Sequence, residues 1–428
     1  MLPGLTILVA CLAASAADPG AVATRFLERC RDARFAEAVE AFDAKMADVL
    51  PASKLAQTWD AVRLGAGDLG SLGPPRVEAR GQHAVVLVRC GFARKALDAQ
   101  VSINPEGKID GLYFRAPKVT GLAPYVKPGT YAESALIVGA EGWPLGATLA
   151  MPEGAGPFPL VVFVHGSGPN DRDETVGANA PFRDLALGLA SRGIATLRYD
   201  KRTKVHGERM AKLTPTLDEE VVDDALAAVA RARTLERVDP RRIFVLGHSL
   251  GAVMAPRIAR RDGHLAGIIW MAGNVRPIDE VVLDQFRYLS RPEAKPSDAV
   301  KDLVRATEAD VAAFRADPEK ADGKILGAPF AYWKELGTVR PERELAELPG
   351  VPVLALQGTR DYQVTMVDFD RLRDALKGRA NASFEAFPDL NHLFIAGSGV
   401  SGPAEYDRPG HVDVRVVERI AAWIDGTK

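Results

Sequence analysis

The sequence has little of several features that mark particular classes of protein. Only 3 of its 428 residues are cysteine, and its formal net charge is −2. It contains no H-E-x-x-H motif, no paired C-x-x-C motif, no glycine-rich phosphate loop and no internal repeat. We therefore expect no metal ion and no cofactor. A weak overall charge also argues against a nucleic-acid partner, so a small-molecule substrate is the default expectation.

Long apolar runs are also scarce, and the one that stands out opens the chain. It extends from Leu5 to Ala14 and overlaps Ala14-Ser15-Ala16, an A-x-A pattern of the kind that signal peptidase cleaves. About ten residues are too few to span a bilayer. We predict a signal peptide over residues 1–16 and an exported protein, periplasmic or secreted, without an integral membrane span. Two alternatives stay open: a short buried helix, and a lipoprotein box that would anchor the protein through Cys11.

Cys30 and Cys90 are the cysteines that remain after such cleavage. An oxidising compartment would permit them to form a disulfide. Two cysteines in one chain are, however, more often small buried side chains, and the sequence favours that interpretation.

The first hundred residues of the mature chain predict a small α+β domain over residues 17–118. Apolar spacing indicates helix over residues 20–50 and again around 55–64. Three alternating segments follow, with a turn at 104–107, and predict an antiparallel sheet. This order of elements resembles the cone-shaped fold of nuclear transport factor. Three roles stay open for this domain: covering an active-site mouth, forming a homodimer, or supporting the fold.

A segment rich in proline and glycine, "APKVTGLAPYVKPGTY", predicts a linker over residues 119–133. Residues 134–428 then alternate between strand-like and helical stretches, which predicts an α/β fold with a mostly parallel sheet and helices on both faces. The strand-like runs are 159–164, 194–199, 243–246, 266–271 and 351–356, and the helical stretches are 182–191, 217–235 and 251–260. Residues 276–348 interrupt this alternation, which predicts an inserted helical cap.

The stretch "VLGHSLGA" places Ser249 between Gly247 and Gly251, directly after a strand-like run and before a helical one. This is the G-x-S-x-G pattern of a nucleophile elbow in the context that it requires. Glycine fits a sharp strand-to-helix turn because neighbouring backbone comes close there. The positive end of the following helix would face an anion formed at the serine. Ser249 is therefore the candidate nucleophile.

A serine hydroxyl needs a base to accept its proton, and a carboxylate to orient that base. Of the seven histidines, His392 in "FPDLNHLF" follows a strand-like segment late in the chain, where a loop would deliver it to the sheet edge. His411 is the second candidate, but it begins the last helical segment. Asp361 follows the strand-like run 351–356. The predicted catalytic residues are Ser249, Asp361 and His392.

Acyl transfer also needs N–H donors for the oxyanion of the tetrahedral intermediate. Leu250 follows the serine, and "PLVVFVHGSGPNDRDET" provides a loop directly after a buried-type strand. We expect backbone N–H groups of Leu250 and Ser167 to form the oxyanion hole, with Gly166 as the alternative to Ser167. Arg172 and Asp173 in the same loop form either a bracing ion pair or a solvated turn.

Together, the segments "HGSGPNDRDET", "LRYDKRT", "GHSLGA", "LQGTRDYQV" and "LNHLF" resemble an α/β-hydrolase of the bacterial esterase and dienelactone-hydrolase-like branch. They are also similar to the acyl-CoA thioesterase and bile-acid acyltransferase group. The resemblance covers roughly residues 130–425 and implies a hydrolase that uses Ser249, His392 and Asp361. Serine stands where the dienelactone hydrolases and acyltransferases commonly use cysteine, which favours hydrolysis of a carboxylic ester and leaves thioesters open.

Other functions remain as alternatives. A serine peptidase of the prolyl-oligopeptidase type would use the same three residues, but about 120 preceding residues without repeats do not supply a propeller. An acyl thioesterase and a noncatalytic hydrolase-like binding protein are the others, since a fold alone does not prove activity. The basic segment 199–209 is interpreted as a solvated loop. Aromatic residues of the predicted cap are interpreted as packing rather than as part of a pocket: Phe286, Tyr288, Phe330, Tyr332 and Trp333.

Overall fold

The structure is a computed structural model, and it describes residues 18–115, 117, 121–213, 215–294, 296 and 298–427. The predicted signal peptide and Cys11 lie outside the described residues. Contacts between residues divide the chain after Pro117 into two compact units, each with its own core. Within the described residues, every helix is too short or too polar to cross a bilayer.

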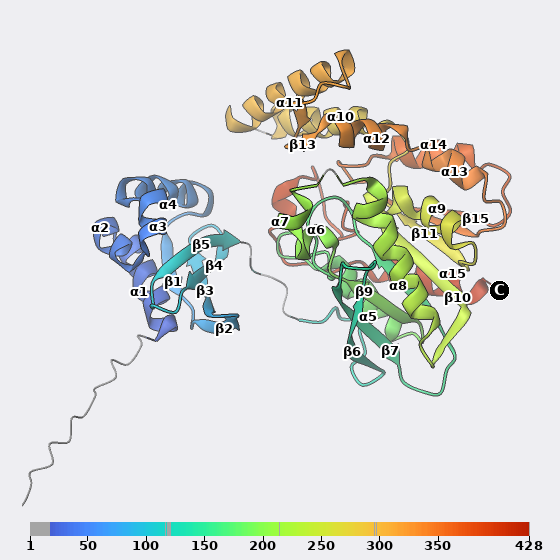
Figure 1. The fold of residues 1–428 in the computed structure, drawn as a ribbon, viewed down its shortest axis with the longest axis horizontal. Helices are drawn as coiled ribbons and strands as arrows, with labels where there is room; N and C mark the ends of the chain where they lie inside the picture. Colours follow the sequence, from blue (N-terminus) through green and yellow to red (C-terminus); the bar gives the residue numbers. More distant parts are fainter. Residues whose placement is uncertain are drawn as a thin grey trace, which may run out of the picture. The chain divides into compact units, whose positions relative to one another are not determined.

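The first unit packs helices against one face of an antiparallel sheet (Figure 1). The strand order is β1-β3-β4-β5, and β2 pairs with β3. Its elements in chain order are α1 (Pro19–Arg31), α2 (Phe35–Ala38), η1 (Val39–Ala41), α3 (Ala44–Val49), α4 (Ala52–Ala66), β1 (Leu69–Leu72), β2 (Arg76–Arg80), β3 (His83–Phe92), β4 (Ala96–Ile103) and β5 (Ile109–Arg115). The predicted α+β architecture is confirmed.

The helix predicted over residues 20–50 is divided into shorter pieces. Asp18 caps the N-terminus of α1: its carboxylate accepts the N–H groups of Gly20 and Ala21, each at 3.2 Å. The chain leaves the helix after Arg31 and passes through Ala33, which has a φ of +57°. Apolar spacing alone does not reveal this break in the helix, because the residues on both sides of the break still face the same core.

Cys30 of α1 and Cys90 of β3 are buried free thiols in that core. Burial raises the pKa of both thiols to about 12. This agrees with the interpretation of both residues as small buried side chains.

The second unit is built on an eight-stranded sheet in the order β15-β14-β11-β10-β8-β9-β7-β6. The strands from β15 to β9 run parallel, and β7 and β6 are antiparallel additions at one edge. The strands are β6 (Tyr131–Val138), β7 (Leu145–Pro152), β8 (Phe158–Val164), β9 (Ala195–Tyr199), β10 (Val238–His248), β11 (Gly267–Met271), β14 (Val353–Gly358) and β15 (Ala382–Phe387). The predicted mostly parallel α/β sheet is confirmed.

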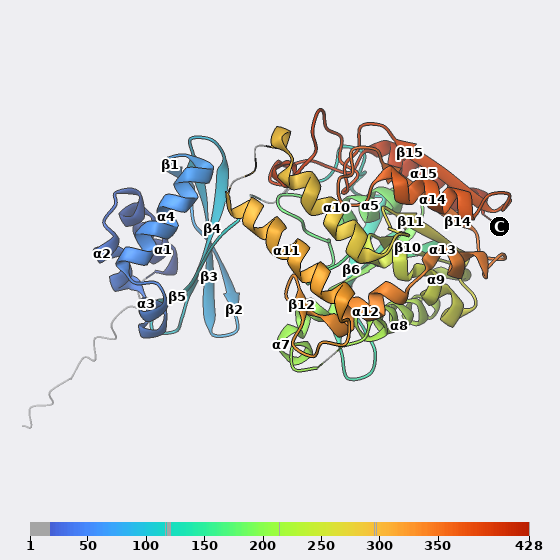
Figure 2. The same cartoon turned by 90° about the horizontal axis from the view of Figure 1, so that it is seen from above.

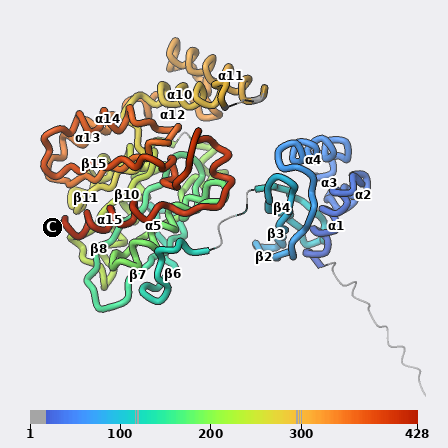
Figure 3. The backbone as a smooth tube through the Cα atoms, turned by 180° about the vertical axis from the view of Figure 1, so that it is seen from behind, coloured from blue at the N-terminus to red at the C-terminus, as the bar shows by residue number. Residues whose placement is uncertain are grey.

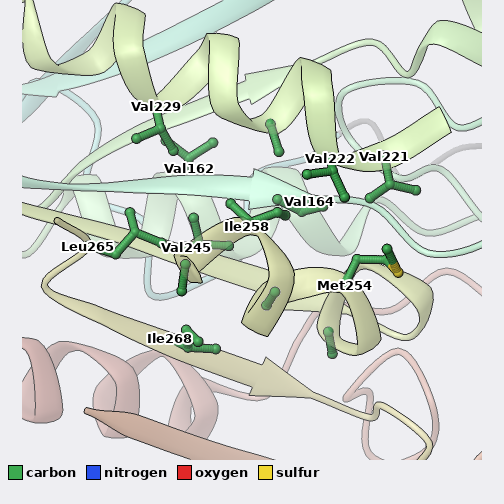
Figure 4. Close-up of a cluster of buried hydrophobic side chains, with 14 of the residues drawn as sticks. Val162, Val164, Val221, Val222, Val229, Val245, Met254, Ile258, Leu265 and Ile268 are labelled. Carbon is green, nitrogen blue, oxygen red and sulfur yellow. The ribbon is translucent and has the colours of Figure 1, made fainter. Parts of the chain in front are cut away.

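Helices cover both faces of this sheet. On one face, α8 (Asp223–Arg233) and α9 (Leu250–Asp262) pack Val229 and Ile258 against Val162 and Val245 of the sheet, in the cluster that Figure 4 shows. The opposite face packs against α5 (Pro181–Ala190) and α15 (Val414–Gly426), which lie side by side (Figure 3). The remaining helical elements are α6 (Arg202–Val205), α7 (Gly207–Met210), the π-helical turn η2 (Asp218–Val222), α14 (Met366–Ala375) and η4 (Pro403–Glu405).

The segment predicted as a linker, 119–133, is partly packed. Ala123 and Val126 are buried with Leu187 and Ala190 of α5, and β6 already begins at Tyr131. Part of this segment therefore belongs to the second unit.

The expected insertion follows β11 and consists mainly of helices (Figure 2). Asp368 ties its first residues to the sheet unit, because the carboxylate accepts the N–H groups of Val275 and Arg276 and pairs with the Arg276 guanidinium at 2.9 Å. The elements are α10 (Ile278–Ser290), η3 (Pro292–Ala294), α11 (Asp298–Ala316), β12 (Lys324–Ile325), β13 (Ala328–Pro329), α12 (Phe330–Thr338) and α13 (Pro341–Ala346). We call residues 276–348 the cap.

Candidate active site

Ser249 occupies a strained turn between β10 and α9. Its φ of +53° and ψ of −118° lie outside the regions that a residue with a Cβ normally adopts. The turn is held because the Ser249 N–H donates to the carbonyl of Met271 at 2.9 Å, while the Ser249 carbonyl accepts the N–H groups of Ala252 and Val253. This conformation places Ser249 where β10 ends, at the positive N-terminal end of the 13-residue helix α9.

Gly247 and Gly251 are required by close backbone contacts on either side of the serine. A Cβ on Gly247 would lie 2.2 Å from the carbonyl oxygen of Gly251. A Cβ on Gly251 would lie 2.1 Å from the carbonyl oxygen of Val164 in the neighbouring strand. Both positions therefore exclude any side chain, which is the physical basis of the G-x-S-x-G pattern here.

His392 and Asp361 lie together on loops that follow β15 and β14. His392 Nδ1 is 2.6 Å from Asp361 Oδ2, and both side chains are buried. Asp361 Oδ1 accepts the N–H groups of Gln363 and Val364 at 2.8 and 3.0 Å. A carboxylate that only accepts hydrogen bonds fixes the His392 proton on Nδ1 and leaves Nε2 free to act as a base.

The second histidine candidate has a different partner. His411 Nδ1 lies 3.1 Å from the carboxylate of Asp184 in α5. Val412 donates its N–H to the same carboxylate, also at 3.1 Å. This pair joins the segment before α15 to α5, and His411 does not line the cavity that contains Ser249.

The loop after β8 brings its first residues against the serine. A Cβ on Gly166 would lie only 3.1 Å from the Ser249 Cβ. The Gly166 N–H, however, is already donated to Glu174 Oε1 at 2.7 Å. It is therefore engaged in the structure, which favours Ser167 over Gly166 as the loop's oxyanion donor. Leu250 lies in the first turn of α9, where helix N–H groups have no acceptor within the helix.

Glu174 also meets His248, the residue before the serine. Glu174 Oε2 and His248 Nδ1 are 2.9 Å apart, and His248 Nε2 lies 2.9 Å from the carbonyl oxygen of His392. Burial opposes the charge on His248, but Glu174, the His392 carbonyl and Asp361 outweigh it and raise the pKa of His248. Burial likewise opposes the charge on Glu174, but His248 and the Gly166 N–H outweigh it, so the pKa of Glu174 is lowered. Sequence patterns did not identify this buried ion pair.

The basic segment 199–209 is not simply a solvated loop. Lys201 is buried and pairs with Glu220 at 2.6 Å, while Arg202 is buried and pairs with Asp224 at 2.7 Å. A buried cation needs a buried partner, and both acidic residues come from η2 and α8. The basic residues of this segment gave no sign of the pairing in the sequence, since exposed and buried ion pairs use the same residue types.

Arg172 and Asp173 do not pair with each other. Arg172 binds Asp200 at 2.5 Å, and Asp173 pairs with Arg198 of β9. Both residues therefore fasten the loop after β8 to β9 and the residue that follows it, and neither lies in a purely solvated turn.

Ser249, Leu250, Ser167, Gly166 and His392 all line one cavity of about 580 Å³. Asp361 lies behind His392 and does not line it. The cap supplies most of the apolar lining: Ile278, Val281, Val282, Leu326, Ala328, Pro329, Tyr332, Trp333 and Leu336. The polar lining consists of Asn170, Glu174, Glu220, His248, Asn274, Gln285 and Gln363 besides the residues named above. The cavity can hold a small organic molecule with one apolar part against the cap.

The cap aromatics divide between packing and cavity lining. Tyr332 and Trp333 line the cavity, and the Trp333 indole N–H donates to the carbonyl of Ile325 at 3.1 Å. The interpretation of these two as packing alone is therefore wrong. Phe286 and Phe330 pack within the cap, and Tyr288 stacks on Tyr362 with ring centres 5.2 Å apart. Periodicity cannot separate these cases, because one helix face serves both purposes.

Within the described part of the chain, no three His, Cys, Asp or Glu residues are grouped so that they could hold a metal ion. The Ser249 hydroxyl and the His392 imidazole line the cavity, and the Asp361 carboxylate contacts that imidazole from behind.

Comparisons with known proteins cover both units. Residues 161–405 match the alpha/beta hydrolase family, and residues 23–112 match a family described only as a protein of unknown function (DUF3887). The chain is 36% identical over 401 residues to esterase EstD of Thermotoga maritima, and the match covers 93% of each chain. It is 24% identical to the uncharacterized protein YfhR of Salmonella typhimurium, over 73% of this chain and 90% of that protein. Among solved structures, Est1E from Butyrivibrio proteoclasticus has a TM-score of 0.46 at 19% identity and covers 68% of this chain and 98% of its own.

Proposed function

Because the chain belongs to the alpha/beta hydrolase family, we propose that it cleaves carboxylic esters through an acyl-enzyme formed on Ser249. It is a carboxylic ester hydrolase, and its relative EstD is named an esterase. The observation that carries the proposed mechanism is the His392–Asp361 contact of 2.6 Å at a cavity that Ser249 also lines.

In the first step, Ser249 Oγ attacks the ester carbonyl while His392 Nε2 takes the serine proton. Asp361 holds the imidazole in the tautomer that has Nε2 free, and it stabilises the imidazolium that forms. The negative charge moves to the carbonyl oxygen, where the N–H groups of Leu250 and Ser167 receive it. His392 then protonates the departing alcohol.

In the second step, water enters the site and His392 takes its proton, so that hydroxide attacks the acyl carbon. The same N–H groups stabilise the second oxyanion, and collapse of this intermediate returns the proton to Ser249. The carboxylic acid is released. Every proton in this cycle passes through His392, so no other titratable side chain is needed at the reacting atoms.

The apolar cap residues support an ester whose acyl part is a hydrocarbon. Val281, Val282 and Trp333 offer apolar contact surface on one side of the cavity, and each buried CH₂ contributes about 0.8 kcal/mol. An ester of moderate length gains binding there without a charged partner.

The test is hydrolysis of p-nitrophenyl esters from acetate to palmitate by the purified protein and by Ser249→Ala. We expect turnover that the variant lacks, together with labelling of Ser249 by a fluorophosphonate probe. Labelling without ester turnover would move the search to thioesters and peptides. Turnover that survives Ser249→Ala, or no labelling at all, would refute the acyl-enzyme mechanism.

We also propose export by the signal peptide over residues 1–16, on the apolar run over residues 5–14 and the A-x-A pattern that it overlaps. The measurement is the mass of the protein recovered from the periplasm or medium after expression of the full chain. A mass that lacks residues 1–16 supports export, and lipid attached to Cys11 supports anchoring. Uncleaved protein that is found only in the cytoplasm refutes both.

A further inference from the structure

The peptide that joins Gly166 to Ser167 is held by a buried cation. Lys201 Nζ donates to the Gly166 carbonyl oxygen at 2.9 Å, and Asn170 Nδ2 donates to the same oxygen at 3.1 Å. The peptide is trans, so its carbonyl and the Ser167 N–H lie in one plane and point in opposite directions. Fixing the direction of the carbonyl therefore fixes the direction of the Ser167 N–H.

A gain in stability does not by itself explain why the Lys201 side chain is buried. Its side chain is 3% exposed and its ammonium lies 2.6 Å from Glu220 Oε1, on a side chain that is 9% exposed. Removing both charges from water costs free energy that their attraction offsets only in part, so a buried pair is weak support for stability. Glu220 lines the cavity, which places this pair at the site and not in a remote part of the core.

The contact with Gly166 brings the charge of Lys201 to the peptide that carries the Ser167 N–H. A hydrogen bond from an ammonium is stronger than one from a neutral donor, and hydrogen bonds in sequence polarise one another. Positive charge at the Gly166 carbonyl therefore makes the Ser167 N–H a better donor as well as a better oriented one. Such a donor needs no reorganisation when the oxyanion forms.

We propose that Lys201, with Asn170, is a positioning residue for the oxyanion hole, acting through the Gly166–Ser167 peptide. This inference rests on the proposed function, because it assigns the Ser167 N–H to the oxyanion. Lys201 does not line the cavity and acts through this peptide. Glu220 neutralises its charge, and Glu174 holds the preceding N–H on the other side of Gly166.

The test compares Lys201→Met/Glu220→Gln with the wild-type enzyme, so that no unpaired charge stays buried. Loss of a whole oxyanion donor typically lowers kcat about 10²- to 10³-fold. Here the donor remains but is misoriented, and we expect kcat to fall about 10- to 100-fold with KM within about twofold. Affinity for an aryl trifluoromethyl ketone, whose adduct with Ser249 carries an oxyanion, should fall by the same factor as kcat.

Arg202 and Asp224 provide a matched control. They form an equally buried ion pair in the adjacent position, with contacts of 2.7 and 2.8 Å, and neither binds Gly166. Arg202→Met/Asp224→Asn should change the melting temperature without lowering ketone affinity or kcat per titrated site. Equal losses in both double variants, or a loss confined to KM, would overturn the inference.

Counting active sites by fluorophosphonate titration restricts kcat to folded molecules. If Lys201→Met/Glu220→Gln yields no folded protein, Asn170→Ala decides, because Asn170 binds the same carbonyl from a partly exposed position. A joint fall in kcat and ketone affinity supports the inference, and wild-type values overturn it.

Wild-type enzyme without Ser249-dependent turnover would refute the proposed function and this inference together, whereas normal turnover in the Lys201 variants refutes this inference alone.

Discussion

Glu174 and His248 form a buried ion pair, with Oε2 and Nδ1 2.9 Å apart, immediately beside the candidate nucleophile. Three backbone segments meet at this pair. Glu174 binds the Gly166 N–H, His248 precedes Ser249, and His248 Nε2 faces the carbonyl oxygen of His392. Each nitrogen of His248 lies 2.9 Å from an oxygen atom, which favours the imidazolium because that form carries a proton on both nitrogens.

Replacing the acid of this pair should cost both stability and activity. Breaking a buried ion pair typically costs 3–5 kcal/mol, so we expect Glu174→Gln to lower the free energy of unfolding by about 3 kcal/mol near pH 6. Ester turnover should also fall, because the loop after β8 and the segment of His392 lose a common support. Urea denaturation and p-nitrophenyl ester assays measure the two effects.

The stability difference should depend on pH in one direction. The pKa of His248 is raised in the folded state, so its contribution is fully present below its unfolded pKa and is lost as the pH rises through the folded value. The pKa of Glu174 is lowered, so its contribution is present above the ordinary glutamate pKa and is lost only in more acidic solution. The difference between wild type and Glu174→Gln should therefore shrink from pH 6 to pH 9. A difference that grows over this range would contradict a charged pair.

The two histidine–aspartate contacts provide a controlled comparison of the base. His392→Ala removes the proposed proton acceptor for Ser249 and should lower kcat/KM by about 10³-fold or more. His411→Ala removes a contact to Asp184 of 3.1 Å away from the cavity and should change kcat/KM less than about threefold. Assays at saturating and limiting substrate separate kcat from KM. The opposite ranking would assign the base to His411.

The strained backbone of Ser249 predicts an unusual order of stabilities. Positive φ with a Cβ costs about 1–3 kcal/mol, and glycine avoids that cost while losing about 0.5–1 kcal/mol of chain entropy on folding. Ser249→Gly should therefore melt at a higher temperature than Ser249→Ala. Ala230, exposed in the interior of helix α8, is the control, because Ala230→Gly should melt at a lower temperature than the protein with alanine there. The same order at both positions would mean that the elbow stores no strain.

The features visible in the sequence are those that a local pattern encodes. The strand-like runs and the elbow at Ser249 could be predicted because apolar runs and paired glycines reflect contacts within one strand and its turn. Asp361 and His392 could be selected because both follow strands of a parallel sheet, whose carboxyl ends share one edge. These two side chains indeed lie together in the structure.

The supporting ion pairs could not be predicted from the sequence. Lys201 and Glu220 come from separate segments, and the spacing of charges does not tell which lysine is buried. Arg172 suggested a pair with its neighbour Asp173, but Arg172 binds Asp200, directly after β9, and Asp173 binds Arg198 within β9. Such choices depend on where the sheet brings distant residues together, and this information is absent from any short window of sequence.

The length of ester that the enzyme accepts should depend on the cap. Ala328 of β13 is partly exposed and lines the cavity with a side chain of one carbon. Ala328→Trp would place a large ring in the cavity and occupy volume that a longer acyl chain would fill. We expect kcat/KM for p-nitrophenyl octanoate to fall about tenfold or more, which is the loss of a few buried CH₂ groups at about 0.8 kcal/mol each, while the acetate ester changes less than about threefold.

Leu303→Trp is the matched control, because Leu303 is 49% exposed on α11 and does not line the cavity. That variant should keep the wild-type ratio of octanoate to acetate turnover. If Ala328→Trp lowers both esters equally, the ring has disturbed Ser249 or His392, or it has displaced the p-nitrophenyl group that both esters share, and not the acyl position. A loss for octanoate no larger than the loss for acetate would therefore contradict binding of the acyl chain on the cap side of the cavity.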